Sequence, residues 1–400
     1  MSSSRFKTIS GTFLIAGTMI GAGMLGIPLV TAPSGLIPGI VSTLIVWFFM
    51  YCTGLLFLEA TLWMPDGSNV LSIAGRYLGR KGRVISALMF IFLYYCLMIA
   101  YFAAGSPMLS SLLSFTGIEL QGWQIYAFFG LIFGSVVAIG PKSIDRVNVI
   151  MSVAMLASWL FLIGSGSQEV KMERLIGTHY SLMPWAMPVL FSAFGFHNVI
   201  PSLCSYLQRD RKALKAAIFW GSLIPLIVYI VWQWLVIGAI APDLLTKGVE
   251  ARGSVIEAFS SHLGNEQLLL FGGSFAFFAI VTSTLGVSFS MVDFLGDGFK
   301  VKRRSGMVRA FLTLLTFFPP FFLASNWPGI FEEALGVAGG FGEAFLNGLL
   351  PISLVWIGTK RFKESTSVKI LENRAFLLFL ALYTLFVVGV EMVQLFRPGV

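Results

Sequence analysis

Four glycines and a proline interrupt the first apolar segment of this chain, in the sequence Gly17-Thr-Met-Ile-Gly21-Ala-Gly23-Met-Leu-Gly26-Ile-Pro28. A glycine inside a helix costs about 0.5–1 kcal/mol relative to alanine, and a proline removes a backbone hydrogen bond. No Asp, Glu, Lys or Arg occurs from residue 8 to residue 58, so the interruption falls in a segment suited to lipid, where broken backbone survives only beside a protein-lined cavity. The free N–H and C=O groups of such a break bind small polar solutes, which predicts a transporter.

A second interruption of the same kind follows in the sequence Phe191-Ser-Ala-Phe-Gly195-Phe-His197-Asn-Val-Ile-Pro201-Ser202. Glycine, polar side chains and proline again meet in the middle of an apolar stretch. Two such segments predict two discontinuous helices whose breaks meet near the middle of a membrane.

The glycines of the first interruption also fit two other patterns. Gly17 and Gly21 form a small-xxx-small pair, which alone allows two membrane helices to approach closely, and this interpretation stays open. Gly21-Ala-Gly23-Met-Leu-Gly26 matches the dinucleotide pattern G-x-G-x-x-G. That pattern requires a preceding strand and an acidic residue roughly 20 positions later. The flanks here are apolar helix and the next acid is Glu59, so we reject a dinucleotide site.

Two ionisable residues lie deep within apolar stretches, where charges are costly and indicate function. His197 lies at the second interruption, and histidine exchanges protons near neutral pH; a neutral structural role is the alternative. Glu343 lies inside the stretch 329–358. Both are candidates for binding a coupled proton, and Glu343 ranks first.

Glu59 and Asp293 lie nearer to the ends of their apolar stretches. We expect them to pair with bases such as Arg76 or Lys300 at an inner gate.

The composition is that of a polytopic membrane protein. Of the 400 residues 56% are hydrophobic and 12% are charged, and the mean hydropathy is +0.85. We therefore predict an all-α protein with a single transmembrane transport domain over residues 1–400. Eleven stretches are long enough to cross about 30 Å of hydrocarbon: 8–31, 35–63, 84–115, 121–141, 146–166, 184–207, 212–241, 267–298, 306–325, 329–358 and 373–396.

The basic residues predict the orientation. With alternate connections on one side, most of the 27 Lys and Arg residues fall together, and the few opposite ones are Lys171, Arg174, Lys247, Arg252 and Arg397. By the positive-inside rule the N-terminus is cytoplasmic and, after an odd number of crossings, the C-terminus is outside. The net charge of +8 is then explained by the lipid bilayer, with no nucleic-acid partner.

Two connections carry patterns of their own. Apolar residues near helical spacing predict a short cytoplasmic helix over 68–79, and the connection 242–265 is a candidate lid. Cys52, Cys96 and Cys204 lie singly in apolar stretches, so we expect no disulfide, no metal site and no cofactor.

The order of the stretches predicts an internal repeat. Stretches one to five (about 8–166) and six to ten (about 184–358) each open with an interrupted segment. Because five is odd, the two halves run through the membrane in opposite directions, as in transporters built from inverted repeats. The last stretch, 373–396, is an extra helix.

Three segments together carry a family resemblance: the first interruption, the second interruption, and Gly221-Ser-Leu-Ile-Pro-Leu-Ile-Val-Tyr-Ile-Val-Trp-Gln233. Along nearly its whole length the chain resembles the hydroxy/aromatic amino acid permease family, most closely its tyrosine- and tryptophan-specific permeases, within the amino acid–polyamine–cation superfamily. The resemblance implies a leucine-transporter-type 5+5 fold, a bacterial inner membrane and proton-driven import of an aromatic amino acid. Glu343 departs from the tyrosine-permease pattern. The alternative is a permease of the same fold that carries serine, threonine or another neutral amino acid.

The resemblance places the substrate's backbone at the first break. Carbonyls that end the first half-helix, near Thr18 and Met19, suit an ammonium group. N–H groups that open the second half-helix suit a carboxylate: Gly21, Ala22 and Gly23. Carbonyls of the second interruption complete the ammonium cage: Phe191, Ser192, Ala193 and Phe194.

The substrate's ring requires aromatic side chains that stack and polar groups that meet a hydroxyl or an indole N–H. The candidates are Tyr101, Phe194, Phe196, Thr282 and Ser283. For coupling, Glu343 and His197 are the proton candidates. A sodium site of first-break carbonyls and hydroxyls such as Thr282 is the alternative, and the residues alone favour neither ion strongly.

Other classes of function lack their motifs. The chain contains no G-x-S-x-G, H-E-x-x-H or G-x-x-x-x-G-K-[ST] sequence, which argues against an intramembrane enzyme and a primary pump. A channel stays possible in principle, and saturable uptake against a gradient would distinguish the two.

Overall fold

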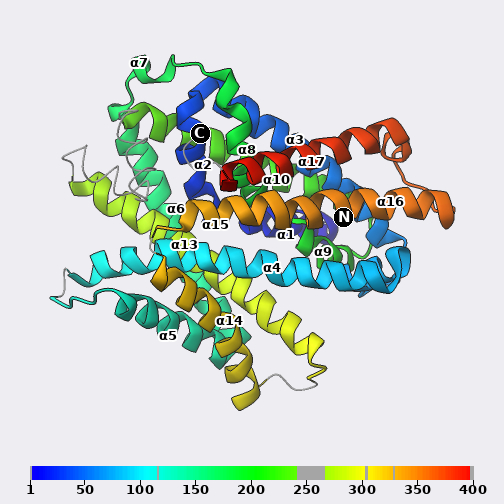
Figure 1. The fold of residues 1–400 in the computed structure, drawn as a ribbon, viewed down its shortest axis with the longest axis horizontal. Coiled ribbons are helices and arrows are strands. Elements are labelled where there is room, and N and C mark those ends of the chain that lie inside the picture. Colours follow the sequence, from blue (N-terminus) through cyan, green and yellow to red (C-terminus); the bar gives the residue numbers. More distant parts are fainter. Residues whose placement is uncertain (1, 115–116, 241–265, 302–304, 328, 397–400) are drawn as a thin grey trace.

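The computed structural model describes residues 2–114, 117–240, 266–301, 305–327 and 329–396, and its regular elements there are all helices (Figure 1). In chain order the α-helices, with the π-helix η5 among them, are α1 (Ser2–Met19), α2 (Gly23–Thr31), α3 (Leu36–Leu62), α4 (Val70–Ser114), α5 (Trp123–Ile139), α6 (Pro141–Gly166), α7 (Met172–Leu175), α8 (Met187–Ala193), α9 (Ile200–Tyr206), α10 (Arg211–Ala239), α13 (Glu266–Gly298), α14 (Met307–Asn326), α15 (Phe331–Val337), η5 (Ala338–Leu349), α16 (Leu350–Arg361) and α17 (Arg374–Phe396). Short 3-10 helices are η1 (Ala32–Ser34), η2 (Ser167–Glu169), η3 (Tyr180–Ala186), η4 (His197–Val199) and η6 (Lys369–Glu372).

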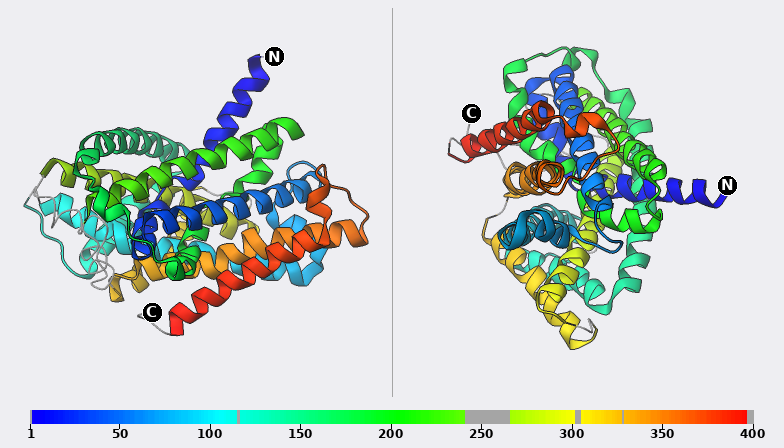
Figure 2. Two further views of the ribbon diagram at one scale, coloured as in Figure 1. Left: turned by 90° about the horizontal axis from the view of Figure 1, so that it is seen from above. Right: turned by 90° about the vertical axis from the view of Figure 1, so that its right-hand side faces the viewer.

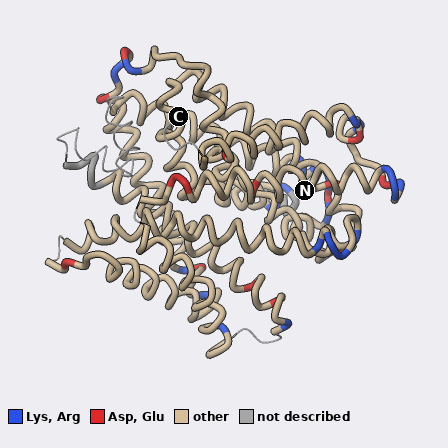
Figure 3. The backbone as a smooth tube through the Cα atoms, in the orientation of Figure 1, with Lys and Arg blue, Asp and Glu red and all other residues tan. Residues whose placement is uncertain are grey.

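The helices have the length and composition of membrane spans. Within the described residues nine are long and apolar enough to cross a membrane, or ten when the bent pair α1 and α2 forms one span. The 17-residue α5 is apolar but shorter. Figure 3 shows that most Lys and Arg lie in connections and near helix ends, with long uncharged stretches between them. The prediction of an all-α polytopic membrane protein is confirmed, whereas the count of eleven crossings stays a prediction.

The first break separates α1 from α2, whose axes differ by 56°. Ile20 N still donates to Ala16 O at 2.9 Å, but Met24 N bonds only three residues back, to Gly21 O at 3.2 Å. Gly23 permits a close approach, because a Cβ there would lie 3.1 Å from the Cα of Ala193. The bend therefore packs α2 directly against α8, the helix that precedes the second break.

The second break lies between α8 and α9. Helix α8 ends at Ala193, the next three residues are not helical, and η4 then leads into α9. Pro201 lies in the first turn of α9, where its missing N–H removes no helical bond. Both predicted discontinuous helices are therefore present.

Two long helical segments contain an irregular stretch. In α4, Gly79 has a φ of 72°, which L-residues rarely adopt, so the predicted short helix over 68–79 is present as a separate segment that begins at Val70. Helices α15 and α16 flank η5, and π-helices are often found at functional sites. The expected lid over 242–265 lies outside the described residues.

The remaining helices surround these elements. Helix α1 packs on α10, and its first part extends away from the body of the molecule (Figure 2). Helix η5 packs against α4, α8 and α17, while α13 packs against α4 and α6. The two breaks and η5 therefore lie together in the interior.

Candidate substrate-binding site

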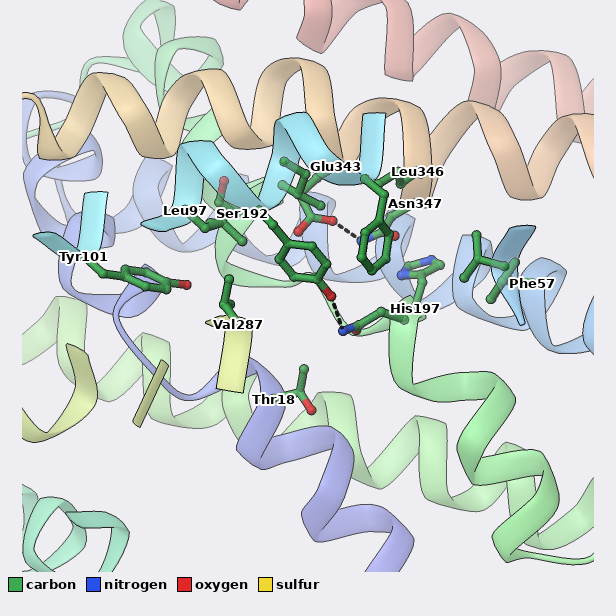
Figure 4. Close-up of a pocket in the computed structure, with 16 residues that line it drawn as sticks. Thr18, Phe57, Leu97, Tyr101, Ser192, His197, Val287, Glu343, Leu346 and Asn347 are labelled. Atoms are coloured by element: carbon green, nitrogen blue, oxygen red, sulfur yellow. Dashed lines mark hydrogen bonds between the residues drawn. The ribbon is translucent and has the colours of Figure 1, made fainter. Parts of the chain in front are cut away.

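A cavity of about 660 Å³, part of it open to solvent, lies beside the two breaks. Side chains from α1, α4, η5 and the second break converge on it (Figure 4). Its polar lining residues are Thr18, Tyr94, Tyr101, Ser192, His197, Asn198, Glu343 and Asn347.

Five residues predicted from the sequence line this cavity: Thr18, Tyr101, Ser192, His197 and Glu343. Two of their hydroxyls already donate to backbone carbonyls, since Thr18 Oγ1 bonds Leu14 O at 2.8 Å and Ser192 Oγ bonds Leu335 O at 2.6 Å. Among the five predicted lining residues, Tyr101 offers an aromatic ring that can pack against a substrate, and Glu343 offers a carboxyl group that can bind a proton.

One backbone amide of the first break, that of Ala22, bonds to helix α13. Ala22 N donates to Ser283 Oγ at 2.9 Å, and Ser283 also interacts with Tyr101. A Cβ on Gly21 would overlap the Ser283 hydroxyl. The described lining of the cavity does not include Gly21, Ala22, Gly23 or Ser283. It does include Tyr101, and the contact between Tyr101 and Ser283 connects the first break to the cavity.

The phenylalanines of the second break lie in the core. Phe191 stacks on Phe49 with ring centroids 5.1 Å apart, and Phe194 meets Tyr229 edge-on at 5.0 Å. Phe196 covers Gly54, where a Cβ would lie 2.6 Å from its ring. These three rings are fully buried and lie outside the described lining of the cavity.

The carbonyls of the two breaks have partners too. Met19 O and Ala193 O both lie within hydrogen-bonding distance of the Tyr229 hydroxyl, at 2.6 and 2.8 Å. Thr282 Oγ1 donates to Ala279 O at 3.0 Å within α13. The predicted roles of Met19, Ala193 and Thr282 as ligands stay predictions.

Glu343 sits where η5 meets the second break. Its carboxylate accepts a hydrogen bond from Asn347 Nδ2, and a Cβ on Gly195 would overlap its Oε1 atom. Among the described residues, no Lys or Arg forms an ion pair with it. A buried carboxyl group without a cation is costly when ionised, so the geometry suits proton binding.

His197 is almost completely buried and lies 3.0 Å, through Nε2, from Thr53 Oγ1. The Thr53 hydroxyl also reaches Phe49 O at 3.2 Å, the bond back to residue i−4 that threonine usually makes in a helix. Nε2 is therefore assigned as the donor and Nδ1 as the acceptor. Within the described part of the chain Nδ1 has no hydrogen-bond partner.

Three polar lining residues were missed by sequence reasoning: Tyr94, Asn198 and Asn347. Asn198 Nδ2 donates to Tyr94 Oη at 3.1 Å. The signal for the two asparagines was present, because Asn198 follows His197 and Asn347 comes one turn after Glu343, both inside apolar stretches.

A second cavity of about 1280 Å³, also partly open to solvent, adjoins the first and shares Val70, Phe90, Tyr94 and Asn198 with it. It extends to Gly67 in the connection between α3 and α4, and to Asp293 and Asp297 on α13. The candidate site therefore communicates with one end of the molecule.

At that end Glu59 pairs with Arg211, at 2.7 Å, and accepts a hydrogen bond from Ser367. Glu59 therefore pairs with a base, as expected, but the base is Arg211 at the start of α10 and not one of the two examples named from the sequence. Arg76 instead lies over the ring of Phe362, with 5.1 Å between its guanidinium carbon and the ring centroid.

Comparison with known proteins identifies the family of this chain, with a match along nearly its full length. The sequence profile of the tryptophan/tyrosine permease family matches residues 4–391. The tyrosine-specific transport system 1 of Haemophilus influenzae is 35% identical over 357 residues, which cover 88% of each chain. The tryptophan-specific transport protein of the same organism is 31% identical, covering 90% of this chain and 89% of its own. The low affinity tryptophan permease of Escherichia coli K12 is 31% identical over 82% of both chains. The chain belongs to the tryptophan/tyrosine permease family.

Proposed function

We propose that the protein is a secondary active permease that imports tyrosine, tryptophan or both across the bacterial inner membrane, coupled to protons. The observation that carries the proposal is the cavity beside two helix breaks, lined by Tyr101, Tyr94 and Glu343. The names of the relatives support an aromatic substrate.

The architecture of the proposal is a 5+5 inverted repeat with eleven crossings. The positions of the breaks support it, because α1 and α2 open one set of five predicted spans and α8 and α9 open the next. Helix α17 is then the extra span. By the positive-inside rule the N-terminus is cytoplasmic and the C-terminus is outside.

With this orientation the second cavity opens to the cytoplasm. It reaches the α3–α4 connection, which is followed by Arg76, Arg80, Lys81 and Arg83. The conformation is then inward-facing, the state from which an importer releases its substrate.

Substrate recognition divides between the breaks and the cavity. The amino and carboxyl groups bind at the breaks, where half-helix ends carry partial charges. Tyr101 packs against the ring. The polar tip of the ring, a phenol hydroxyl or an indole N–H, meets the hydrogen-bonding groups of Tyr94, Asn198 and Asn347, which line the same cavity.

Proton coupling is assigned to Glu343, ahead of His197. Glu343 lines the cavity with a hydrogen bond from Asn347 but no ion pair among the described residues. Sodium held by carbonyls of the first break and by the Thr282 hydroxyl, which donates to Ala279 O and keeps its lone pairs, is the alternative.

The substrate assignment is tested by competition of twenty amino acids against labelled tyrosine in proteoliposomes. Tyrosine and tryptophan should compete best. Tyr101→Ala should weaken both of them more than it weakens serine, by a few kcal/mol at most, the scale of a lost large apolar contact. If serine or threonine competes best, the protein is instead a permease for small hydroxy amino acids.

A further inference from the structure

One side chain of α10 touches both broken helices at the points where they stop. The Tyr229 hydroxyl lies 2.6 Å from Met19 O and 2.8 Å from Ala193 O. Met19 is the last residue of α1, and Ala193 is the last residue of α8. The two carbonyls, far apart in sequence, therefore share one phenol group.

Helix ends explain why a donor is needed there. The last carbonyls of a helix have no N–H partner within it, and leaving such a group buried and unpaired costs about 1–3 kcal/mol. Tyr229 is fully buried, so water does not compete for its hydroxyl. Its single proton replaces the missing helical donors at both breaks, either shared between the two carbonyls or exchanged from one to the other.

Helix α10 holds the same region through other contacts. A Cβ on Gly221 would lie 2.9 Å from Thr12 O and 2.7 Å from the Cβ of Ile15, so α1 lies directly on α10. Gln233 Nε2 donates to Thr43 Oγ1 of α3 at 3.0 Å. The Tyr229 ring also meets Phe194. The hydroxyl of Tyr229 is thus held in place by a helix that is itself fixed to its neighbours.

We infer that Tyr229 is the positioning residue that joins the two breaks into one substrate site. Without touching the substrate, its hydroxyl fixes the ends of α1 and α8 relative to each other, so that backbone groups of both breaks face the substrate together. The inference rests on the proposed function for its effect on binding. Its effect on the backbone does not depend on that function.

The test removes one oxygen atom with Tyr229→Phe, which keeps the ring against Phe194. Hydrogen–deuterium exchange of the purified protein without substrate should rise at residues 20–25 and at residues 194–199 together. The affinities for tyrosine and tryptophan should fall by the same factor, about tenfold, because the loss is at the backbone site and not at the ring. The matched control is Tyr95→Phe, which removes a similar bond, from Tyr95 Oη to Leu315 O at 2.9 Å, and should change neither quantity.

Exchange that rises at one break alone, at neither break, or along the full length of α1 and α8 would overturn the inference. So would unequal losses for the two substrates. If Tyr229→Phe does not fold, 3-fluorotyrosine at position 229 offers a stronger donor and should slow exchange at both breaks; unchanged exchange would contradict the inference. A failure of the aromatic assignment would appear in the binding measurements alone.

Discussion

The carboxylate of Glu343 rests directly on the backbone of Gly195, so closely that a Cβ on the glycine would overlap Oε1. Gly195 is in the nonhelical part of the second break, and Glu343 is in the π-helix η5. The contact brings the proposed proton-binding group against the backbone that is proposed to bind substrate. Movement of one is therefore expected to displace the other.

Gly195→Ala should separate these two groups. The added methyl group must push the carboxylate from its Asn347 partner, and a buried polar group left without its hydrogen bond costs about 1–3 kcal/mol, which corresponds to roughly a 5- to 150-fold loss of uptake. Initial rates in proteoliposomes measure the loss. Gly286→Ala is the control, since a Cβ there has no neighbour within 4 Å; equal rates for the two variants would show that the contact is not needed.

Glu343→Gln should abolish accumulation while exchange of internal for external substrate continues. The amide keeps the shape and the contact with Asn347 but cannot bind and release a proton, and exchange requires no net proton movement. Counterflow and gradient-driven uptake of labelled tyrosine separate the two activities. If Glu343→Gln still accumulates substrate, another group binds the coupled proton. His197→Gln is then the next variant to measure.

Alanine substitutions at two glycines of the first interrupted segment should have very different effects on substrate affinity and stability. Gly21→Ala directs a methyl group onto Ser283, which holds Ala22 N, and should reduce substrate affinity. Gly17→Ala meets no atom within 4 Å and lies in helix α1, where alanine is favoured by up to about 1 kcal/mol. Binding and thermal stability of both variants test this, and a loss of thermal stability in Gly17→Ala would support the small-xxx-small interpretation.

Arg211→Gln should destabilise the protein by about 1–3 kcal/mol. It leaves Glu59, which is 1% exposed, without its cation, while the 43% exposure of Arg211 keeps the cost below that of a fully buried pair. The midpoint of thermal unfolding in detergent measures the change. The double variant Glu59→Gln, Arg211→Gln should recover part of the loss, and strictly additive losses would mean that the pair is not coupled.

The sequence predicted the breaks because glycine, proline and polar residues inside lipid-compatible stretches have few explanations. It named Tyr101, which lines the cavity, but it did not separate this residue from aromatic candidates that lie in the core. Phe194 and Phe196 lie in the second break as expected, but their rings pack on Tyr229 and Gly54. In a chain with 38 phenylalanines, composition does not distinguish a ring in the core from one at a site.

Partners across helices were also beyond sequence reasoning. The pairs of Tyr229 with Met19 and of Ser283 with Ala22 join residues separated by 210 and 261 positions. Such contacts depend on how α10 and α13 are packed, which the hydropathy of each helix leaves undetermined. For the same reason the sequence predicted that Glu59 pairs with a base but did not identify that base as Arg211.

The central claim is most directly tested by the uptake of labelled tyrosine and tryptophan into proteoliposomes that carry the purified protein and an imposed inward proton gradient, with sodium absent. The account predicts that both amino acids, or one of them, accumulate above the external concentration, that uptake saturates, and that a proton ionophore abolishes accumulation. Accumulation driven only by sodium, or flux that equilibrates without saturating, would contradict it.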